Sequence, residues 1–313
     1  MTTTLDPVAA TRARPARPPR RAGRSQRRTT LIALAFLAPS AIPLALFTLW
    51  PMLNAAWISL HEWNLIGDMR FVGFENYASL LTDLSTWNVV LHTLYYIVGY
   101  LPLVYIGGLC IALALNTRLR GRTFFRGIYF LPVVTSWIAV ALVWRWLLNP
   151  SNGIVNSALG MIGVEGPGWW TDPMWAMPSV IIASAWKDLG FVMVILLAGL
   201  QAIPEDVLEA AKVDGAGRWR TLWSVTLPML SPSTFFVVVI SLINGFQVFD
   251  QVYAMVGPSA APAAEVVVQR IYNLTFQYQR AGEASALSWI LFAVILAVTL
   301  LQTRAQRRWV HYA

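Results

Sequence analysis

Six long apolar stretches determine what this chain of 313 residues can fold into. Each is long enough to cross a bilayer as a helix, which takes about 20 residues. Only 12% of the residues are charged, against roughly 25% in a soluble domain, so a soluble protein is excluded. We therefore expect an all-α polytopic membrane protein with six transmembrane helices, and no alternating pattern predicts a sheet. The six stretches cover residues 31–53, 89–115, 128–148, 175–200, 234–256 and 285–302.

The basic residues between these stretches are distributed unevenly. Of the 23 Lys and Arg residues, 18 lie in four segments, which are residues 1–30, 117–127, 205–232 and 304–313. Cytoplasmic loops of membrane proteins carry the excess of Lys and Arg. The bias therefore predicts that both termini and the segment 205–232 face the cytoplasm.

Residues 1–30 combine eight arginines with four prolines and lack apolar periodicity. This composition predicts a disordered basic tail held near anionic membrane lipid. A nucleic-acid-binding arm is the alternative, and we expect no nucleic-acid partner. The apolar stretch that follows is too long for a signal peptide and lacks a small-residue cleavage site, so we expect it to be retained as a span.

The segment 204–232 is the only long polar interruption in the second half of the chain. Pro204 at the first helical position, with Glu205 and Asp206 in the first turn, predicts the start of a helix. Gly215 is a natural C-terminal cap. A second helical pattern follows at Trp219, Leu222, Trp223 and Thr226. We expect a helix–turn–helix between two spans, with an amphipathic loop resting on lipid headgroups as the alternative.

A spaced motif lies within this segment. It reads Glu209-Ala210-Ala211, three residues, Gly215, nine residues, Val225, one residue and then Leu227-Pro228. The motif resembles the EAA loop of ABC-importer permeases, with Val225 where isoleucine is common. The resemblance implies a coupling helix that docks into a groove on a cytoplasmic ATPase subunit. The implied coupling residues are Glu209, Ala210, Ala211, Asp214, Gly215, Leu227 and Pro228.

Further segments resemble the sugar permeases of the same family, in the class typified by the larger maltose-transport permease. The likeness covers nearly all of residues 31–302, apart from the last outer loop, where Gly257-Pro258 leads into an Ala/Pro stretch instead of a Gly-rich run. The segments that carry it are Phe71–Tyr77, Phe125–Pro132, Trp186–Pro204 and Phe249–Tyr253.

This resemblance implies a type I ABC-importer transmembrane domain that imports a sugar or similar polar solute across a bacterial cytoplasmic membrane. The implied partners are a second homologous permease, two ATPase subunits that use ATP and Mg²⁺, and an extracytoplasmic solute-binding protein. The expected parts are the tail at 1–30, a first span with an external segment at 31–87, a permease core at 88–303 with the coupling loop at 204–232, and a cytoplasmic tail at 304–313.

The chain lacks the residues of an enzyme. Neither Lys187 nor Lys212 follows a glycine, so the phosphate-binding loop of an ATPase is excluded. His61, His92 and His311 are scattered, which argues against a metal site or a catalytic triad. We expect no catalytic residue, no metal site and no cofactor bound by this chain.

Several polar residues fall inside the predicted spans. Lys187 lies roughly 20 Å of helix from the end of its span, near the middle of the bilayer. An unpaired charge there costs about 2.5–3.5 kcal/mol. Its neighbour Asp188 projects about 100° away, so each residue needs a partner of its own. A structural or gating ion pair is favoured for Lys187 over contact with a solute. An ion-coupled secondary transporter that uses both residues is the alternative function.

The predicted fifth span carries Asn244 and Gln247 one helical turn apart, with Asp250 near its outer end. These side chains either face a solute pathway or link helices by hydrogen bonds. Of the fifteen tryptophans, Trp186 is the one candidate for the pathway. The candidate pathway residues are therefore Trp186, Lys187, Asn244, Gln247 and Asp250.

Overall fold

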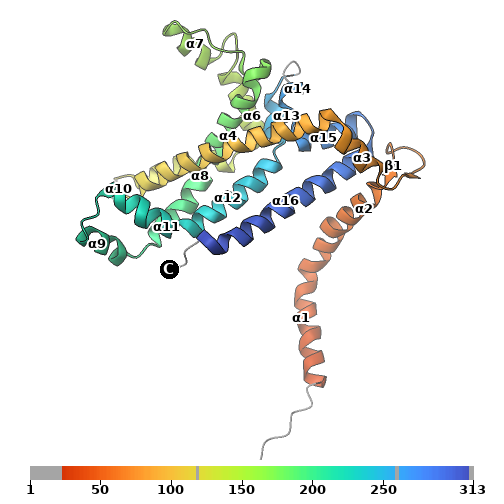
Figure 1. Ribbon diagram of the computed structural model, residues 1–313, viewed down its shortest axis with the longest axis horizontal. Coiled ribbons are helices and arrows are strands. Elements are labelled where there is room, and N and C mark those ends of the chain that lie inside the picture. Colours follow the sequence, from red (N-terminus) through yellow and green to blue (C-terminus); the bar gives the residue numbers. More distant parts are fainter. Residues whose placement is uncertain (1–22, 118–119, 258–260, 310–313) are drawn as a thin grey trace, which may run out of the picture. The chain divides into compact units, whose positions relative to one another are not determined.

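The computed structural model describes residues 23–117, 120–257 and 261–309 (Figure 1). Contacts divide the chain into two units, residues 1–54 and 55–313. The first unit contains α1 (Gly23–Leu44), a π-helical turn η1 (Ala45–Leu49) and the first part of α2 (Trp50–Ile58). The π-helical turn follows Pro43, whose ring disturbs the regular hydrogen-bond ladder. Phe36 and Phe47 are exposed on this helix, as a lipid-facing surface requires.

Helices extend further into the two predicted tails than the sequence indicated. Residues 1–22 and 310–313 lie outside the described residues, and so do the predictions for them. Residues 23–30 are helical, so the prediction of disorder up to residue 30 is wrong there. At the other end, α16 (Ala281–Trp309) continues through residues 304–309 of the predicted C-terminal tail. Both corrections have one cause: adding a residue to an existing helix requires no new nucleation.

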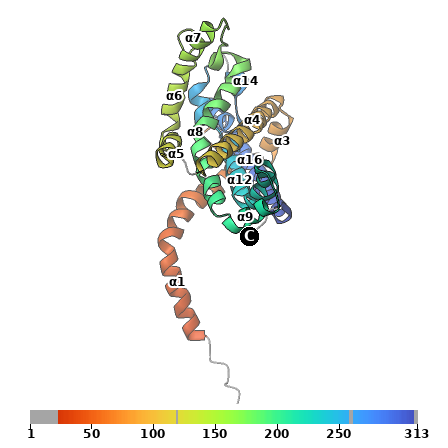
Figure 2. The same ribbon diagram turned by 90° about the vertical axis from the view of Figure 1, so that its left-hand side faces the viewer.

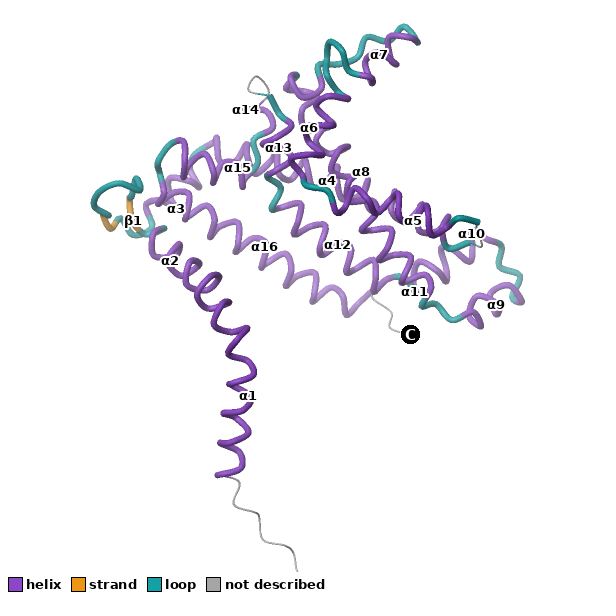
Figure 3. Tube along the Cα trace, turned by 180° about the vertical axis from the view of Figure 1, so that it is seen from behind, coloured by secondary structure: helices purple, strands orange, loops and turns teal. Residues whose placement is uncertain are grey.

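Four helices are long and apolar enough to cross a membrane: residues 32–58, α4 (Leu84–Leu115), α8 (Pro173–Gln201) and α16. Two bent helix pairs raise the number to six if each pair is one span. The all-α architecture with six spans is thus the architecture of the described chain. In Figures 1 and 3, α16 runs from the end of the second unit that holds β1 to the end that holds α11.

The third predicted span is not continuous. It consists of α5 (Arg122–Phe130), a 3₁₀ turn η2 (Leu131–Val134) and α6 (Trp137–Leu147), bent by 102°. The predicted span over 128–148 is therefore a bent pair of helices and not one continuous helix. The break falls at Thr135 and Ser136, whose backbones are extended, with ψ of 150° and 140°. Gly190 of α8 packs against the end of α5. A Cβ at this position would lie 2.0 Å from the carbonyl oxygen of Tyr129, so only glycine fits without a shift of the backbone.

The fifth predicted span is also interrupted. The helix α12 (Ser231–Phe246) ends at Gln247, and α13 (Asp250–Met255) begins three residues later. The prediction of a continuous span over 234–256 is therefore wrong. Non-helical backbone at membrane depth is tolerated where it lines a cavity, and a cavity lies at this break. The chain continues through α14 (Ala261–Ala264), α15 (Val267–Tyr272) and a π-helical turn η5 (Asn273–Gln277). Residues 258–260 of the last outer loop are outside the described residues.

A small sheet and a short helix lie at one end of the second unit. Strands β1 (His61–Glu62) and β2 (Arg70–Phe71) pair antiparallel and lead into α3 (Glu75–Thr82). The expectation of no sheet is wrong here, because two-residue strands are too short to show an alternating pattern. The start of α16 packs against this sheet. A Cβ on Gly282 would lie 2.0 Å from the carbonyl oxygen of His61.

The longest helices pack through glycines. α4 and α8 lie against each other (Figures 1 and 2). Gly108 of α4 faces Val192, and a Cβ there would come within 2.6 Å of that side chain. Small residues permit such close approach between helices in a membrane. A loop follows α6 and contains α7 (Ile154–Met161) and a 3₁₀ turn η3 (Trp169–Thr171).

Candidate functional site

The first limb of the loop 204–232 is a helix, as expected, although Pro204 is its N-cap and not its first helical residue. The helix α9 (Glu205–Val213) begins directly after Pro204. The backbone N–H of Gly215 donates to Lys212 and that of Ala216 donates to Ala211, both at 3.0 Å. These two bonds form a Schellman cap, which needs a left-handed residue, and Gly215 has φ of +77°. The predicted glycine bend is therefore present.

The second limb is less regular than the sequence predicted. It comprises α10 (Arg218–Thr221), a π-helical turn η4 (Leu222–Thr226) and α11 (Leu227–Met229). A bend of 66° then separates this limb from α12. The two ends of the loop meet at Gly199, where a Cβ would lie 2.2 Å from Oγ of Ser233. The loop therefore leaves and re-enters the helix bundle at adjacent points.

The predicted coupling residues differ in exposure. Glu209, Ala210, Asp214 and Gly215 are exposed, whereas Ala211 is buried at 9% exposure. Ala211 therefore packs against other residues of this chain. Of the two alanines, only Ala210 is exposed and accessible to a partner protein. Leu227 and Pro228 are half-buried at the foot of the loop. Their role in coupling stays a prediction.

Apolar side chains are also exposed on this loop, and the sequence argument did not identify them as candidates. Val213 is 88% exposed, and Trp219 and Trp223 are 75% and 66% exposed. Their helical spacing had indicated only an amphipathic face. Exposed aromatic residues beside charged ones are typical of an interaction surface.

A cavity of about 460 Å³ lies where α12 ends. Three predicted pathway residues, Asn244, Gln247 and Asp250, line it together, and their side chains are exposed there. Asp188 of α8 and Gln251 of α13 add further polar side chains to the lining. Aromatic residues of α4, α6 and the break make up much of the rest of the wall: Tyr96, Tyr100, Trp137 and Phe249.

Tyr96 and Tyr100 connect the cavity wall to the core. Their rings stack with centroids 5.3 Å apart, as expected for residues one helical turn apart. The hydroxyl of Tyr100 donates to Oδ2 of Asp188 at 2.7 Å, and Nε2 of Gln251 donates to the hydroxyl of Tyr96 at 3.3 Å. The i, i+4 spacing of two tyrosines in a span was the sequence signal for these residues.

Lys187 does not line the cavity. Its Nζ donates to the carbonyl oxygen of Val133 at 3.1 Å and lies 5.0 Å from the ring centroid of Trp137. The break after α5 leaves the Val133 carbonyl without a helical partner, and the ammonium group supplies one. Lys187 and Asp188 thus contact different neighbours, as their 100° offset on the helix predicted. The partner of Lys187 is a backbone carbonyl oxygen, so the predicted ion pair is not the contact that it makes.

Trp186 faces away from the cavity. It lines a separate apolar groove with residues of α5 and α6, and its ring makes an edge contact with Trp144 at 5.8 Å. The structure therefore does not bring Trp186 together with Asn244, Gln247 and Asp250.

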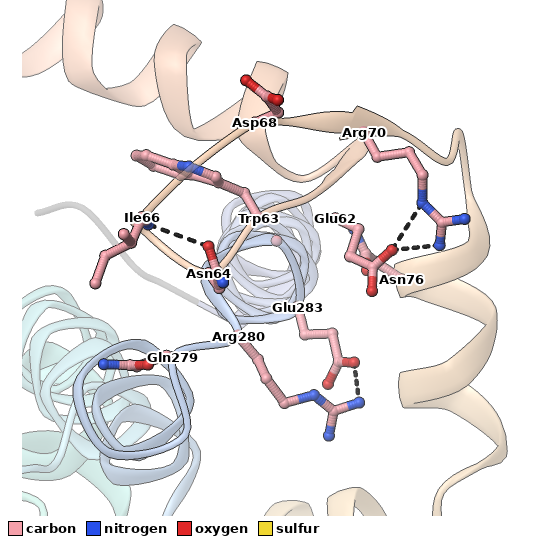
Figure 4. A pocket seen from close by; sticks show the side chains of 11 residues that line it. Glu62, Trp63, Asn64, Ile66, Asp68, Arg70, Asn76, Gln279, Arg280 and Glu283 are labelled. Atoms are coloured by element: carbon pink, nitrogen blue, oxygen red, sulfur yellow. Dashed lines mark hydrogen bonds and ion pairs between the residues drawn. The ribbon is translucent and has the colours of Figure 1, made fainter.

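A second polar pocket, of about 470 Å³, lies at the β1 end (Figure 4). Nε of Arg70 donates to Glu62 at 2.9 Å. Arg280 pairs with Glu283 on the facing wall. Trp63 and Asp68 project from the connecting loop. In the part of the chain that the structure describes, no group of three or more His, Cys, Asp or Glu residues is placed to hold a metal ion.

Comparison with known proteins places these features in a family. Residues 105–311 match the family of binding-protein-dependent transport system inner membrane components. The chain is 31% identical to the probable ABC transporter permease protein YesP of Bacillus subtilis, over 92% of this chain and 94% of that protein. It is 32% identical to the sulfoquinovosyl glycerol transport system permease protein SmoG of Agrobacterium fabrum, over 88% and 91% of the two chains.

Solved structures agree with the sequence relatives. A chain of a bacterial alginate ABC transporter, in complex with an alginate pentasaccharide-bound periplasmic protein, superposes with a TM-score of 0.82 at 26% identity. The match covers 92% of this chain and 98% of that one. This chain therefore belongs to the family of binding-protein-dependent transport system inner membrane components, and it is a permease subunit of an ABC importer, not itself an enzyme.

Proposed function

We propose that this chain carries a sugar or similar polar solute through the cavity beside Asp188. Separate subunits hydrolyse the ATP that drives this transport, and they bind to this chain at the loop 204–232. The capped α9 carries the coupling part of this proposal. A charged residue, Glu209, and a small one, Ala210, are exposed on a short helix that Gly215 ends. Such a helix fits a groove on a partner and moves as one piece. ATP and Mg²⁺ then act in the partner subunits.

The proposed orientation places the loop 204–232 and both termini in the cytoplasm of a bacterium. The bias of basic residues supports it. The loop lies at the opposite end of the second unit from β1 and α3 (Figures 1 and 3), as inner and outer segments of a permease must. The pocket at Arg70 and Arg280 then faces outward, where it offers charged pairs to a solute-binding protein.

The proposed complex contains two ATPase subunits, a second homologous permease and an extracytoplasmic solute-binding protein. The names of the relatives support a carbohydrate or related solute: SmoG is named for a sulfoquinovosyl glycerol system, and the alginate transporter binds an oligosaccharide through its periplasmic protein. The solutes in these names differ, so they support a class of solute and not one compound.

Co-purification tests the coupling role. In mild detergent, the tagged chain is expected to bring down its ATPase subunits, and Glu209→Lys is expected to abolish this by reversing the exposed charge of α9. Lys212→Glu, on the same helix, is the matched charge change outside the predicted coupling residues, and it should retain the subunits. Retention by Glu209→Lys would contradict the proposal. Uptake that a protonophore abolishes while ATP is maintained would favour the ion-coupled alternative with Lys187 and Asp188.

A further inference from the structure

The cavity at the end of α12 has an unbalanced charge. Two carboxylates, Asp188 and Asp250, line it, and its described lining includes no Lys, Arg or His. A recess with walls of low dielectric constant focuses the field of the charges that face it. A solute in this cavity therefore meets a negative potential.

The neighbouring Lys187 does not line the cavity, and its charge offsets only part of this potential. Its side chain is 5% exposed and is directed to the carbonyl of Val133 and the ring of Trp137. The cation is thus held in the wall by neutral groups, while the carboxylate of Asp188 faces the cavity. The hydroxyl of Tyr100, donating at 2.7 Å, holds that carboxylate in place.

The rest of the lining suits a polyhydroxyl solute. Asn244 and Gln247 each supply an amide donor and acceptor, and their side chains are exposed to the cavity. The rings of Trp137 and Phe249 supply apolar faces. The volume of about 460 Å³ lies within the range of small-molecule sites.

We propose that this cavity selects against anionic solutes and that Asp188 is the specificity-determining residue, so that the imported solute is a neutral or cationic polyhydroxyl compound. The inference rests on the proposed function, in which this cavity is the route of the solute. Under this inference, sugar acids, sugar phosphates and sulfonated sugars are not substrates of this chain.

Small charged thiol reagents measure the potential directly, without a known solute. Cys110 is the only cysteine, so Cys110→Ser gives a background for Gln247→Cys in the cavity. The full chain in membranes is treated with a trimethylammonium methanethiosulfonate and with a sulfonate methanethiosulfonate, and the ratio of the two labelling rates is taken. Ser151→Cys, in an exposed turn before α7, gives the reference ratio.

The cationic reagent is expected to be favoured at position 247 by roughly fivefold over the reference, as one unit charge about 8 Å away produces even in water. Asp188→Asn should bring the ratio toward the reference, and Lys187→Met should raise it. If Asp188→Asn fails to accumulate, the ratio in the parent Gln247→Cys protein decides whether the cavity is negative, and Asp188→Ser in the same background decides whether Asp188 is the source.

Three outcomes would overturn the inference: a ratio at or below the reference, a ratio that Asp188→Asn leaves unchanged, and a position 247 that neither reagent labels. None of them touches the co-purification result, so a failure of this inference is distinguishable from a failure of the proposed function.

Discussion

At the scale of single residues, Gly215 shows how one backbone angle determines the form of a functional segment. Its φ of +77° is disfavoured for any residue with a Cβ, although no described atom lies within 4 Å of where a Cβ would stand. The constraint at this position is therefore conformational and not steric. Gly217, two residues later, has φ of −68° and equally open surroundings.

Gly215→Val is expected to weaken binding of the ATPase subunits by roughly five- to thirtyfold, since the left-handed conformation costs a branched residue about 1–2 kcal/mol. Gly217→Val should change binding by less than about twofold, because its backbone is already extended. Binding of purified ATPase subunit to the detergent-solubilised chain measures both. Equal effects of the two substitutions would show that the cap does not hold α9 in its binding form.

Asp83 is a second residue whose local contacts lead to a measurable property. It is the N-cap of α4 and accepts from the backbone N–H of Ser85 at 2.9 Å. Hydrogen bonds from the Ser85 hydroxyl and backbone, together with the nearby Arg270, lower the pKa of its carboxyl group. Because the folded pKa is lowered, the stabilisation is present above the unfolded pKa and is lost as pH falls through the folded pKa.

Asp83→Ala is expected to lower the free energy of unfolding by about 1 kcal/mol at neutral pH through loss of the cap. Asp83→Asn keeps a capping oxygen but not the charge, so its thermal stability should depend less on pH than the wild type between about pH 5 and pH 3. Thermal aggregation of the purified protein across this range measures both effects. A wild type and an Asn variant with parallel pH profiles would be inconsistent with a charged cap.

At the scale of elements, the sequence predicted which segments are helical and missed where helices break. Long apolar stretches identify spans because every backbone group in lipid must be bonded internally. The break at Thr135 and Ser136 lies beside contacts made by another element: Gly190 of α8 packs against Tyr129, and Lys187 donates to the carbonyl oxygen of Val133. Such contacts join residues distant in sequence, and no local pattern reports them.

The packing of α4 on α8 is an element-scale property with its own test. A Cβ at Gly108 would lie 2.6 Å from Val192 and 3.2 Å from the backbone nitrogen of Met193. Gly108→Ala is therefore expected to destabilise the protein by about 1–3 kcal/mol through overpacking.

Gly127→Ala is the matched control, because Gly127 lies inside helix α5 with no described atom within 4 Å of a Cβ. This change should be neutral or stabilising by up to about 1 kcal/mol, the difference in helix propensity. The melting temperature in detergent compares the two variants. A Gly108→Ala protein as stable as the control would mean that α4 and α8 do not pack at this distance.

At the scale of the whole molecule, the family followed from the sequence because its motif is local: Glu209 through Pro228 lie on one loop. The cavity did not follow, since Tyr96, Trp137, Asp188 and Asn244 come from four helices. The sequence identified Asn244, Gln247 and Asp250 together because they lie within seven residues. It assigned Trp186 to the pathway from its residue type and its place within a span, but the side chain of Trp186 lines an apolar groove with residues of α5 and α6.

The contact of Gly199 with Ser233 has a mechanical consequence. The two ends of the loop 204–232 are packed against each other where α8 ends and α12 begins. Under the proposed coupling, a displacement of α9 therefore reaches both α8 and α12. Under the proposed coupling, a movement of the loop is passed to α8, which bears Asp188, and to α12, which bears Asn244, so both helices that line the cavity are displaced together.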